Sequence, residues 1–160
     1  MMAGSPPPSQ VQTIHATCVA IEGCVILLTG PSGSGKSDLA LRLIDRGAQL
    51  VSDDYTQISN APDGTLIASA PPTISGKMEI RGIGIIEIPY IECISIRLVV
   101  ELGEAPERLP LTALSARLGN IDLPMMKLSA FEASAPLKVE MMLRQIRNSG
   151  ALPTGPHDER

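Results

Sequence analysis

Aromatic side chains are almost missing from this sequence. Its 160 residues include no tryptophan, one phenylalanine and two tyrosines. Proteins that bind single-stranded nucleic acid usually stack bases on aromatic rings, so this class of protein is disfavoured. Positive charge is also in short supply, because 13 basic residues stand against 17 acidic ones and give a formal net charge of −4. A protein that follows a phosphate backbone needs an excess of basic side chains. The sequence therefore predicts no nucleic-acid partner.

Cysteine is scarce as well. The three cysteines, Cys18, Cys24 and Cys93, form no C-x-x-C pair, and an odd count without paired histidines indicates neither a disulfide framework nor a zinc site. We expect buried thiols in a reducing compartment. No apolar run approaches the roughly 18 residues that a membrane-spanning helix needs, and the first residues lack the regions of a signal peptide. The sequence therefore predicts a cytoplasmic protein with no membrane partner.

The length suits one domain, since domains usually contain about 100–200 residues. Residues 1–13 are rich in proline, serine and glycine and predict a disordered lead-in. Residues 151–160 predict a disordered tail. One folded domain is therefore expected over residues 14–150.

Patterns typical of strands dominate the middle of the chain, and helical patterns flank them. Strands are expected over residues 17–21, 25–29, 49–52, 83–88 and 94–102, with a hairpin over 55–59 and 65–68 around Asp63-Gly64. Helices are expected over residues 36–46, 111–118 and 135–147. Ser134 is the expected N-cap of the last helix, and Leu137, Met141 and Ile146 are expected to face the core. The combination predicts the α/β class, with a mixed β-sheet and flanking helices.

A glycine-rich loop follows the second strand. Residues 30–37 match the pattern G-x-x-x-x-G-K-[ST] in full. Glycines let successive backbone N–H groups point into one concavity that binds anions, and the helix that follows adds the positive end of its dipole. Lys36 supplies a charge for the β- and γ-phosphates, and Ser37 offers a hydroxyl to Mg²⁺. The sequence thus predicts a nucleoside triphosphate site formed by Gly30, Pro31, Ser32, Gly33, Ser34, Gly35, Lys36 and Ser37.

Two adjacent carboxylates, Asp53 and Asp54, close the strand after the loop helix. Strand ends at the same edge of a parallel sheet meet near the phosphate loop, so a carboxylate here could hold Mg²⁺ or accept a proton from an attacking hydroxyl. Repulsion between adjacent carboxylates can make one of them a usable base. An ordinary solvated turn is the other interpretation of this pair.

The segment from Met78 to Ile86 is spaced by glycines. If extended, it places Glu79 and Arg81 on one face, where they would suit a metal ligand and a charge clamp for phosphate. An amphipathic strand with a surface ion pair is the alternative. Two weaker candidates are His15, which precedes the first strand, and Glu101, which ends an apolar strand in the manner of the metal-binding carboxylate of a Walker-B strand. For His15 the plainer interpretation is a histidine near a flexible end.

Taken together, these residues resemble the catalytic domain of HPr kinase/phosphorylase. His15 stands before the first strand, the phosphate loop is followed by Asp38, and Asp53-Asp54 come at the family's spacing. The run Met-Glu-Ile-Arg-Gly-Ile-Gly-Ile-Ile at residues 78–86 is similar to the family signature and is more specific than a phosphate loop. The resemblance covers residues 14–102 well and the remainder weakly.

The resemblance implies a P-loop kinase on a fold related to phosphoenolpyruvate carboxykinase, acting on a serine of HPr, a small phosphocarrier of the phosphotransferase system. It implies that Asp54 is the base, that His15 and Lys36 are also catalytic, that Asp53 supports the site, and that Ser37 and Glu79 hold Mg²⁺. ATP is the implied phosphate donor, and a homo-oligomer, a hexamer in the family, is the implied assembly.

The chain departs from the family in two ways. The separate N-terminal domain of the usual family chain has no room here, as in short proteobacterial forms. The late basic loop, whose arginine the family uses in dephosphorylation, corresponds to residues 127–136, which contain no arginine. The kinase direction is therefore better supported than the phosphorylase direction.

Two other functions fit the same motifs. One is a small-molecule kinase on the same fold, although the short chain leaves little sequence to enclose a small substrate. The other is a non-catalytic nucleotide-sensing module that regulates a partner, although the intact Asp54 and Glu79 argue against a dead enzyme. In each case the lack of aromatic residues predicts that nucleotide affinity rests on the phosphates and that base discrimination is weak.

Overall fold

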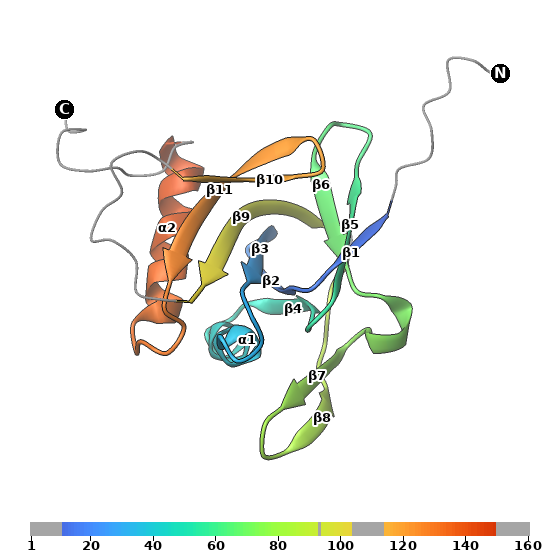
Figure 1. Ribbon diagram of the computed structural model, residues 1–160, viewed down its shortest axis with the longest axis vertical. Helices are drawn as coiled ribbons and strands as arrows, with labels where there is room; N and C mark the ends of the chain where they lie inside the picture. The colour runs from blue at the N-terminus through green and yellow to red at the C-terminus, as the bar shows by residue number, and fades with distance from the viewer. Residues whose placement is uncertain (1–10, 93, 104–113, 150–160) are drawn as a thin grey trace.

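The computed structural model describes residues 11–92, 94–103 and 114–149 of the chain. Strands carry most of this structure, and two helices pack against it (Figure 1). Cys93, most of the expected lead-in and the whole expected tail lie outside the described residues. In chain order the elements are β1 (Gln12–Ile14), β2 (Thr17–Ile21), β3 (Cys24–Thr29), α1 (Lys36–Asp45), β4 (Gln49–Ser52), β5 (Thr56–Asn60), β6 (Leu66–Ser69), the short 3₁₀ helix Pro72–Ile74, β7 (Lys77–Ile80), β8 (Gly84–Glu87), β9 (Ile94–Leu102), β10 (Ser115–Leu118), β11 (Ile121–Leu128) and α2 (Ala135–Ser149).

The main sheet is mixed, as expected for this class. Its strands lie in the order β1-β5-β6-β9-β3-β2-β4, and β11 also pairs with β9 and carries β10 on its outer edge. β3 and β9 are parallel, whereas β2 is antiparallel to both β3 and β4. β4 therefore runs in the same direction as β3 with β2 between them. The carboxyl ends of β3 and β4 consequently lie at the same end of the sheet, which is where the phosphate loop and Asp53 emerge.

The two faces of the sheet bury different side chains. Along β3, Ile26 and Leu28 face a cluster that includes Leu39 and Leu43 of α1, whereas Val25 and Leu27 face the opposite cluster. Helix α2 adds Val139 to the helix-side cluster. Because successive side chains of a strand point to opposite faces, a continuously apolar strand indicates burial on both faces. This explains the unbroken apolar sequence of β3.

A β-bulge in β9 changes this alternation. Val25 of β3 pairs with Ile96, but its neighbour Ile26 pairs with Leu98, so Arg97 is the extra residue. The bulge directs Ile96 to one core cluster and Leu98 to the other, although the two residues are separated by two positions. An extra residue of this kind re-aims the side chains that follow it. It allows the remainder of β9 to place Leu98, Val100 and Leu102 beneath the helices.

Strands β7 and β8 form a separate two-stranded hairpin that projects from the sheet beside α1 (Figure 1). Met78 is its buried anchor in the helix-side core. The extended segment expected from the glycine spacing is wrong, because residues 81–83 form the turn that joins the two strands. Arg81 therefore lies at the tip of a hairpin, and Glu79 lies in β7 opposite Ile85 of β8.

Most of the expected elements are confirmed to within one or two residues, and three further expectations, besides the extended segment, are wrong. A helix over 111–118 is contradicted by strand β10; residues 111–113 are outside the described part. Gln12 and Thr13, expected in the disordered lead-in, pair with β5 as part of β1. Pairing with a sheet edge orders residues that their composition alone would leave unstructured.

The third correction concerns the face of α2. Leu137 and Met141 are exposed, with 43% and 58% of their surface accessible, whereas Ile146 is buried as expected. The buried stripe runs through Ala135, Val139 and Leu143 instead. Both sets of residues follow helical spacing, and the smaller Ala135 and Val139 let the helix approach the sheet closely. Arg46, the C-cap residue of α1, donates to Glu140 and links the end of α1 to α2.

No helix in the described part of the chain is long and apolar enough to cross a membrane.

Candidate active site

The phosphate loop is packed tightly between β3 and α1. Gly35 is the N-cap of α1 and has a left-handed backbone with φ of 96°. Gly30 has φ of 144°, and a Cβ at this position would lie 2.7 Å from the carbonyl oxygen of Leu102. Glycine is thus required at Gly30 by the close approach of β9 as well as by its backbone. The loop can hold its curled form only with these residue types.

The ammonium of Lys36 is folded back over the loop. Its Nζ donates to the carbonyl oxygens of Gly30 at 2.8 Å and Pro31 at 3.0 Å. Only 7% of the residue is exposed, although lysine is rarely buried. These bonds place a positive charge directly on the anion-binding loop.

Ser34 contributes a hydroxyl that has no partner among the described residues. Its Oγ is buried, and it would lie 2.7 Å from a Cβ at Gly30. A buried hydroxyl without a hydrogen bond costs free energy, so such a group in a phosphate loop suits a ligand oxygen. The loop therefore presents backbone N–H groups, one ammonium and one unpaired hydroxyl, a set that fits a polyphosphate.

The carboxylate of Asp53 joins three elements at the end of β4. Its Oδ1 accepts hydrogen bonds from the hydroxyl of Ser37 at 2.6 Å and that of Thr17 at 3.2 Å. Its Oδ2 accepts from the backbone N–H of Glu79 at 3.2 Å. Asp53 therefore ties the first turn of α1, the start of β2 and strand β7 to one buried carboxylate. The solvated-turn interpretation of this residue is wrong.

Thr17 fixes the backbone of Asp54. The Thr17 hydroxyl, which donates to Asp53, also accepts a hydrogen bond from the backbone N–H of Asp54 at 3.0 Å. Asp54 has φ of 72°, in the left-handed region that few residues other than glycine adopt. Thr17 is fully buried. Sequence reasoning missed this residue, because a hydroxyl at the start of a strand carries no distinctive signal.

His15 lies against the exposed carboxylate of Asp54. Its Nε2 is 2.9 Å from Asp54 Oδ1. An ionised carboxylate can only accept hydrogen bonds, so Nε2 is the donor when Asp54 is ionised. The ring of Tyr55 lies 5.3 Å from the His15 ring, measured between centroids, and covers one side of it. His15 is therefore a structured part of the site rather than a residue of a flexible end.

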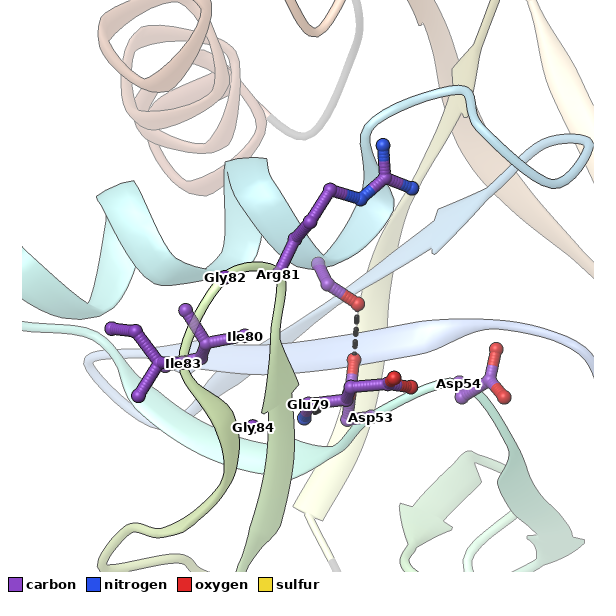
Figure 2. Close-up of a pocket in the computed structure, with 9 residues that line it drawn as sticks. Asp53, Asp54, Glu79, Ile80, Arg81, Gly82, Ile83 and Gly84 are labelled. Carbon is purple, nitrogen blue, oxygen red and sulfur yellow. Dashed lines mark hydrogen bonds between the residues drawn. The ribbon is translucent and has the colours of Figure 1, made fainter.

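A pocket beside the phosphate loop brings the predicted acidic residues together (Figure 2). It is lined by Ser37, Asp53, Asp54, Glu79, Ile80, Arg81, Gly82, Ile83 and Gly84. In Figure 2, Ile83 and Asp54 lie at opposite ends of the pocket, with Glu79 and Asp53 between them. Among the described residues no ion pair joins Glu79 to Arg81, so the alternative of a surface ion pair is not supported for this hairpin.

The oxygen ligands in this pocket fit Mg²⁺ that is also held by phosphate. Ser37 and Glu79 contribute a hydroxyl and a carboxylate to the lining, and Mg²⁺ prefers oxygen ligands. Over residues 11–92, 94–103 and 114–149, no three His, Cys, Asp or Glu side chains form a ready-made metal site. Mg²⁺ usually binds through one or two protein groups together with substrate phosphates and water, so the two observations agree.

Glu101 lies apart from these residues. It pairs in register with Thr29 at the carboxyl end of β9, but it is not among the residues that line the pocket. Its carboxylate is half exposed and lies 4.0 Å from Lys127 Nζ on β11. The structure therefore gives no support for Glu101 as a metal ligand.

The family model and the similar proteins found by comparison indicate the same family. Residues 8–135 match the family described as the HPr Serine kinase C-terminal domain. A protein of Prosthecochloris aestuarii named HPr kinase/phosphorylase is 36% identical over 132 residues, which cover 75% of this chain and 39% of that protein. A Clostridium botulinum protein of the same name is 47% identical over 78 residues, or 49% of this chain and 25% of that protein.

The solved structures include a relative of similar extent. The structure titled Hpr(Ser) kinase/phosphatase from Coxiella burnetii matches with a TM-score of 0.76 and 30% sequence identity, over 87% of this chain and 92% of that one. By contrast, the chain spans well under half the length of the curated relatives above. The family match covers most of the chain and includes the phosphate loop, both aspartates and the β7–β8 hairpin. The chain therefore belongs to the HPr serine kinase C-terminal domain family.

Proposed function

We propose that this chain is the catalytic domain of a protein serine kinase that uses ATP and Mg²⁺ to phosphorylate an HPr-like phosphocarrier protein of a phosphotransferase system. The observation that carries the proposal is that Ser37 of the phosphate-loop helix and Asp54 line one pocket. A phosphate loop by itself suits any protein that binds a nucleoside triphosphate. An exposed carboxylate in the adjoining pocket is what transfer to a hydroxyl requires in addition.

Binding of ATP would rest on the loop. Backbone N–H groups of the loop, which Pro31 cannot supply and of which that of Ser34 already donates to the Pro31 carbonyl, would surround the phosphates together with the ammonium of Lys36. The pre-formed hydrogen bonds of Lys36 keep its charge in place. Ser37 and Glu79 would hold Mg²⁺, which neutralises phosphate charge when bound. Asp53 supports this arrangement by accepting a hydrogen bond from the hydroxyl of Ser37, so that the lone pairs of the Ser37 oxygen stay available.

In the transfer step Asp54 acts as the base. The carrier's serine hydroxyl enters the pocket beside Asp54, and the carboxylate takes its proton as the serine oxygen bonds to the γ-phosphorus. The bond from the γ-phosphorus to the bridging oxygen breaks, and ADP leaves. His15 holds Asp54 through Nε2 and keeps the carboxylate aimed into the pocket. Arg81, which lines the pocket at the tip of the hairpin, would neutralise charge on the transferred group.

The reverse reaction would use the same groups. Attack of inorganic phosphate on the phosphoserine would release pyrophosphate while Asp54 returns the proton to the serine oxygen. The stretch 127–136 contains no arginine, and we therefore propose the kinase direction as the principal one. Incubation of phosphorylated carrier with phosphate, followed by measurement of pyrophosphate, tests the reverse activity separately.

The decisive experiment is transfer from labelled ATP with Mg²⁺ to the HPr-like proteins of the host, followed by mapping of the modified residue. We expect one phosphoserine on the carrier. Asp54→Asn should lower the transfer rate by about 10²–10⁴-fold while ATP binding is retained. Asp122→Asn is the matched control, because Asp122 is an exposed carboxylate in the β10–β11 hairpin that pairs only with Arg117 among the described residues.

Three results would contradict the proposal. Full transfer activity in Asp54→Asn would show that Asp54 is not the base. Transfer to a small metabolite but never to a carrier protein favours a small-molecule kinase. ATP binding without turnover on any carrier favours a nucleotide-sensing module.

We also propose the extent, the compartment and the assembly of the protein. The folded domain comprises residues 14–150 together with strand β1, and the protein acts in the cytoplasm. It forms a homo-oligomer, and the family resemblance implies a hexamer. Light scattering of the purified protein measures the assembly, and a monomeric mass would contradict it.

A further inference from the structure

The loop between β11 and α2 lies directly on the phosphate loop. A Cβ added to Gly35 would lie 2.7 Å from the Cβ of Ala130 and 3.2 Å from two ring carbons of Phe131. Ala130 is buried in this contact, with 1% of its surface exposed, whereas Phe131 is 68% exposed. The edge of the Phe131 ring therefore lies next to Gly35 of the phosphate loop, while most of the ring faces solvent.

Hydrogen bonds on both sides hold the backbone of Phe131 in place. Arg42 of α1 donates to the carbonyl oxygens of Ala130 and Glu132, the two neighbours of Phe131 in the chain. Arg42 is in turn held by Asp38, 2.9 Å away in the first turn of the same helix. The phosphate-loop helix thus fixes the backbone that presents Phe131. Covering the exposed ring with a flat apolar partner would remove its surface from water, which is favourable.

Different segments of the chain lie on the two sides of α1. The β7–β8 hairpin, which carries Glu79 and Arg81, lies on one side of α1, and the loop from β11 to α2 lies on the other (Figure 1). A nucleoside triphosphate is linear, with the transferred phosphoryl group at one end and the base at the other. If the γ-phosphate points to the pocket at Asp54, the base extends away from the hairpin, toward the loop that carries Phe131.

We propose that Phe131 is a stacking platform for the base of the bound nucleotide, an inference that rests on the proposed function. Phe131 is the only phenylalanine of the chain, and the chain has no tryptophan. Stacking on an aromatic face tolerates every base, because each base has a π-face. The platform therefore adds affinity without selecting adenine. It agrees with the weak base discrimination expected from the sequence, but it adds a contribution of the base to an affinity that the sequence analysis assigned to the phosphates.

The experiment compares ATP, GTP and inorganic tripolyphosphate, each with Mg²⁺, by calorimetric titration. Phe131→Ala should weaken the binding of ATP and GTP by about 10-fold, the order of one base–aromatic stack, and leave tripolyphosphate unchanged. Leu137→Ala is the matched control, since Leu137 is an exposed apolar residue of the adjoining helix. It should change neither affinity. Equal affinities for ATP in the wild type and Phe131→Ala, or equal weakening of ATP and tripolyphosphate, overturn the proposal.

A second variant reports base contact directly. Phe131→Trp introduces the only indole of the protein, so its fluorescence should change on addition of ATP and stay constant on addition of tripolyphosphate. An identical response to both ligands overturns the platform. The two proposals fail separately: a base effect without transfer to any carrier contradicts the kinase alone, whereas transfer without a base effect contradicts the platform alone.

Discussion

The imidazole of His15 and the carboxylate of Asp54 are 39 positions apart in the chain and 2.9 Å apart in space. His15 follows β1 and Asp54 follows β4, two strands that do not pair with each other. Thr17, two residues beyond His15, is also bonded to Asp54, through the backbone N–H. The segment 15–17 therefore determines both where the proposed base lies and how its side chain points.

Removal of the imidazole should impair transfer without affecting nucleotide binding. In His15→Ala, Asp54 loses the donor that orients it, and the transfer rate should fall about 10–100-fold, the order of a misplaced catalytic group. The KM for ATP should stay unchanged, because the hydrogen bond of His15 goes to Asp54 and not to the phosphate loop. Steady-state kinetics with saturating carrier measure both. His157→Ala, which changes the other histidine of the chain and lies outside the described residues, is the control. A selective rise in the KM for ATP would contradict this role.

The buried hydroxyl of Thr17 should matter for both stability and catalysis. Thr17→Val keeps the shape but leaves the backbone N–H of Asp54 and one lone pair of Asp53 without a partner. The free energy of unfolding should fall by about 1–3 kcal/mol, and the transfer rate should fall further than the loss of folded protein explains. Thr17→Ser restores the hydroxyl and should recover the rate. Urea denaturation and kinetics test this. A positioning role is ruled out if Thr17→Val and Thr17→Ser have the same rate.

Two effects can require glycine in the phosphate loop: a left-handed backbone and a lack of space for a Cβ. Comparison of Gly35 with Gly33 distinguishes them. Both have a left-handed backbone, with φ of 96° and 85°, but only Gly35 has atoms near the position of a Cβ. Gly35→Ala should therefore destabilise the protein by about 1–3 kcal/mol more than Gly33→Ala, the usual cost of overpacking. The two melting temperatures, measured without nucleotide, give the comparison. Equal losses of stability would show that the contact with Ala130 is not tight.

The buried thiol of Cys18 predicts a decline of stability in alkali. Burial raises the pKa of Cys18 to about 12, despite a hydrogen bond with Thr56 that lowers it. The unfolded thiol has a pKa of about 8.5, so the folded state binds this proton more tightly. The resulting stability is fully present below the unfolded pKa and is lost as the pH rises toward the folded one, by up to about 1.4 kcal/mol per pH unit.

Comparison of the wild type with Cys18→Ala isolates this titration. The free energy of unfolding of Cys18→Ala should fall less steeply between pH 9 and 11, as measured by urea denaturation at each pH. Parallel curves for the two proteins would show that the Cys18 thiol does not control alkaline stability. In the folded wild type, Cys18 should also resist alkylation at pH values where a free cysteine reacts.

Local patterns predicted the centre of this fold well. The strands at residues 17–21, 49–52 and 94–102 have the predicted limits, because continuous apolar runs bounded by turn residues leave few alternatives. The phosphate loop is a local structure as well. The proposed site residues came from motifs and family resemblance, and the pocket brings Ser37, Asp53, Asp54 and Glu79 together.

The errors arose where two structures share one pattern. Leu111, Leu114 and Leu118 follow helical spacing, yet residues 115–118 form β10 and turn through Gly119-Asn120 into β11. That dipeptide is a hairpin signal and would have identified both strands. The role of Thr17 has no such signal, since its two hydrogen bonds reach residues 36 and 37 positions away. Only the tertiary structure brings these groups together.

The hydrogen bonds of Lys36 affect how tightly a nucleotide can bind. A free lysine side chain loses conformational entropy when it becomes ordered, at a cost of about 1.5–2 kcal/mol. Here the Gly30 and Pro31 carbonyls have already ordered and largely desolvated this side chain during folding. Folding, and not binding, therefore bears the entropy cost of ordering Lys36. The free energy of polyphosphate binding is not reduced by that cost.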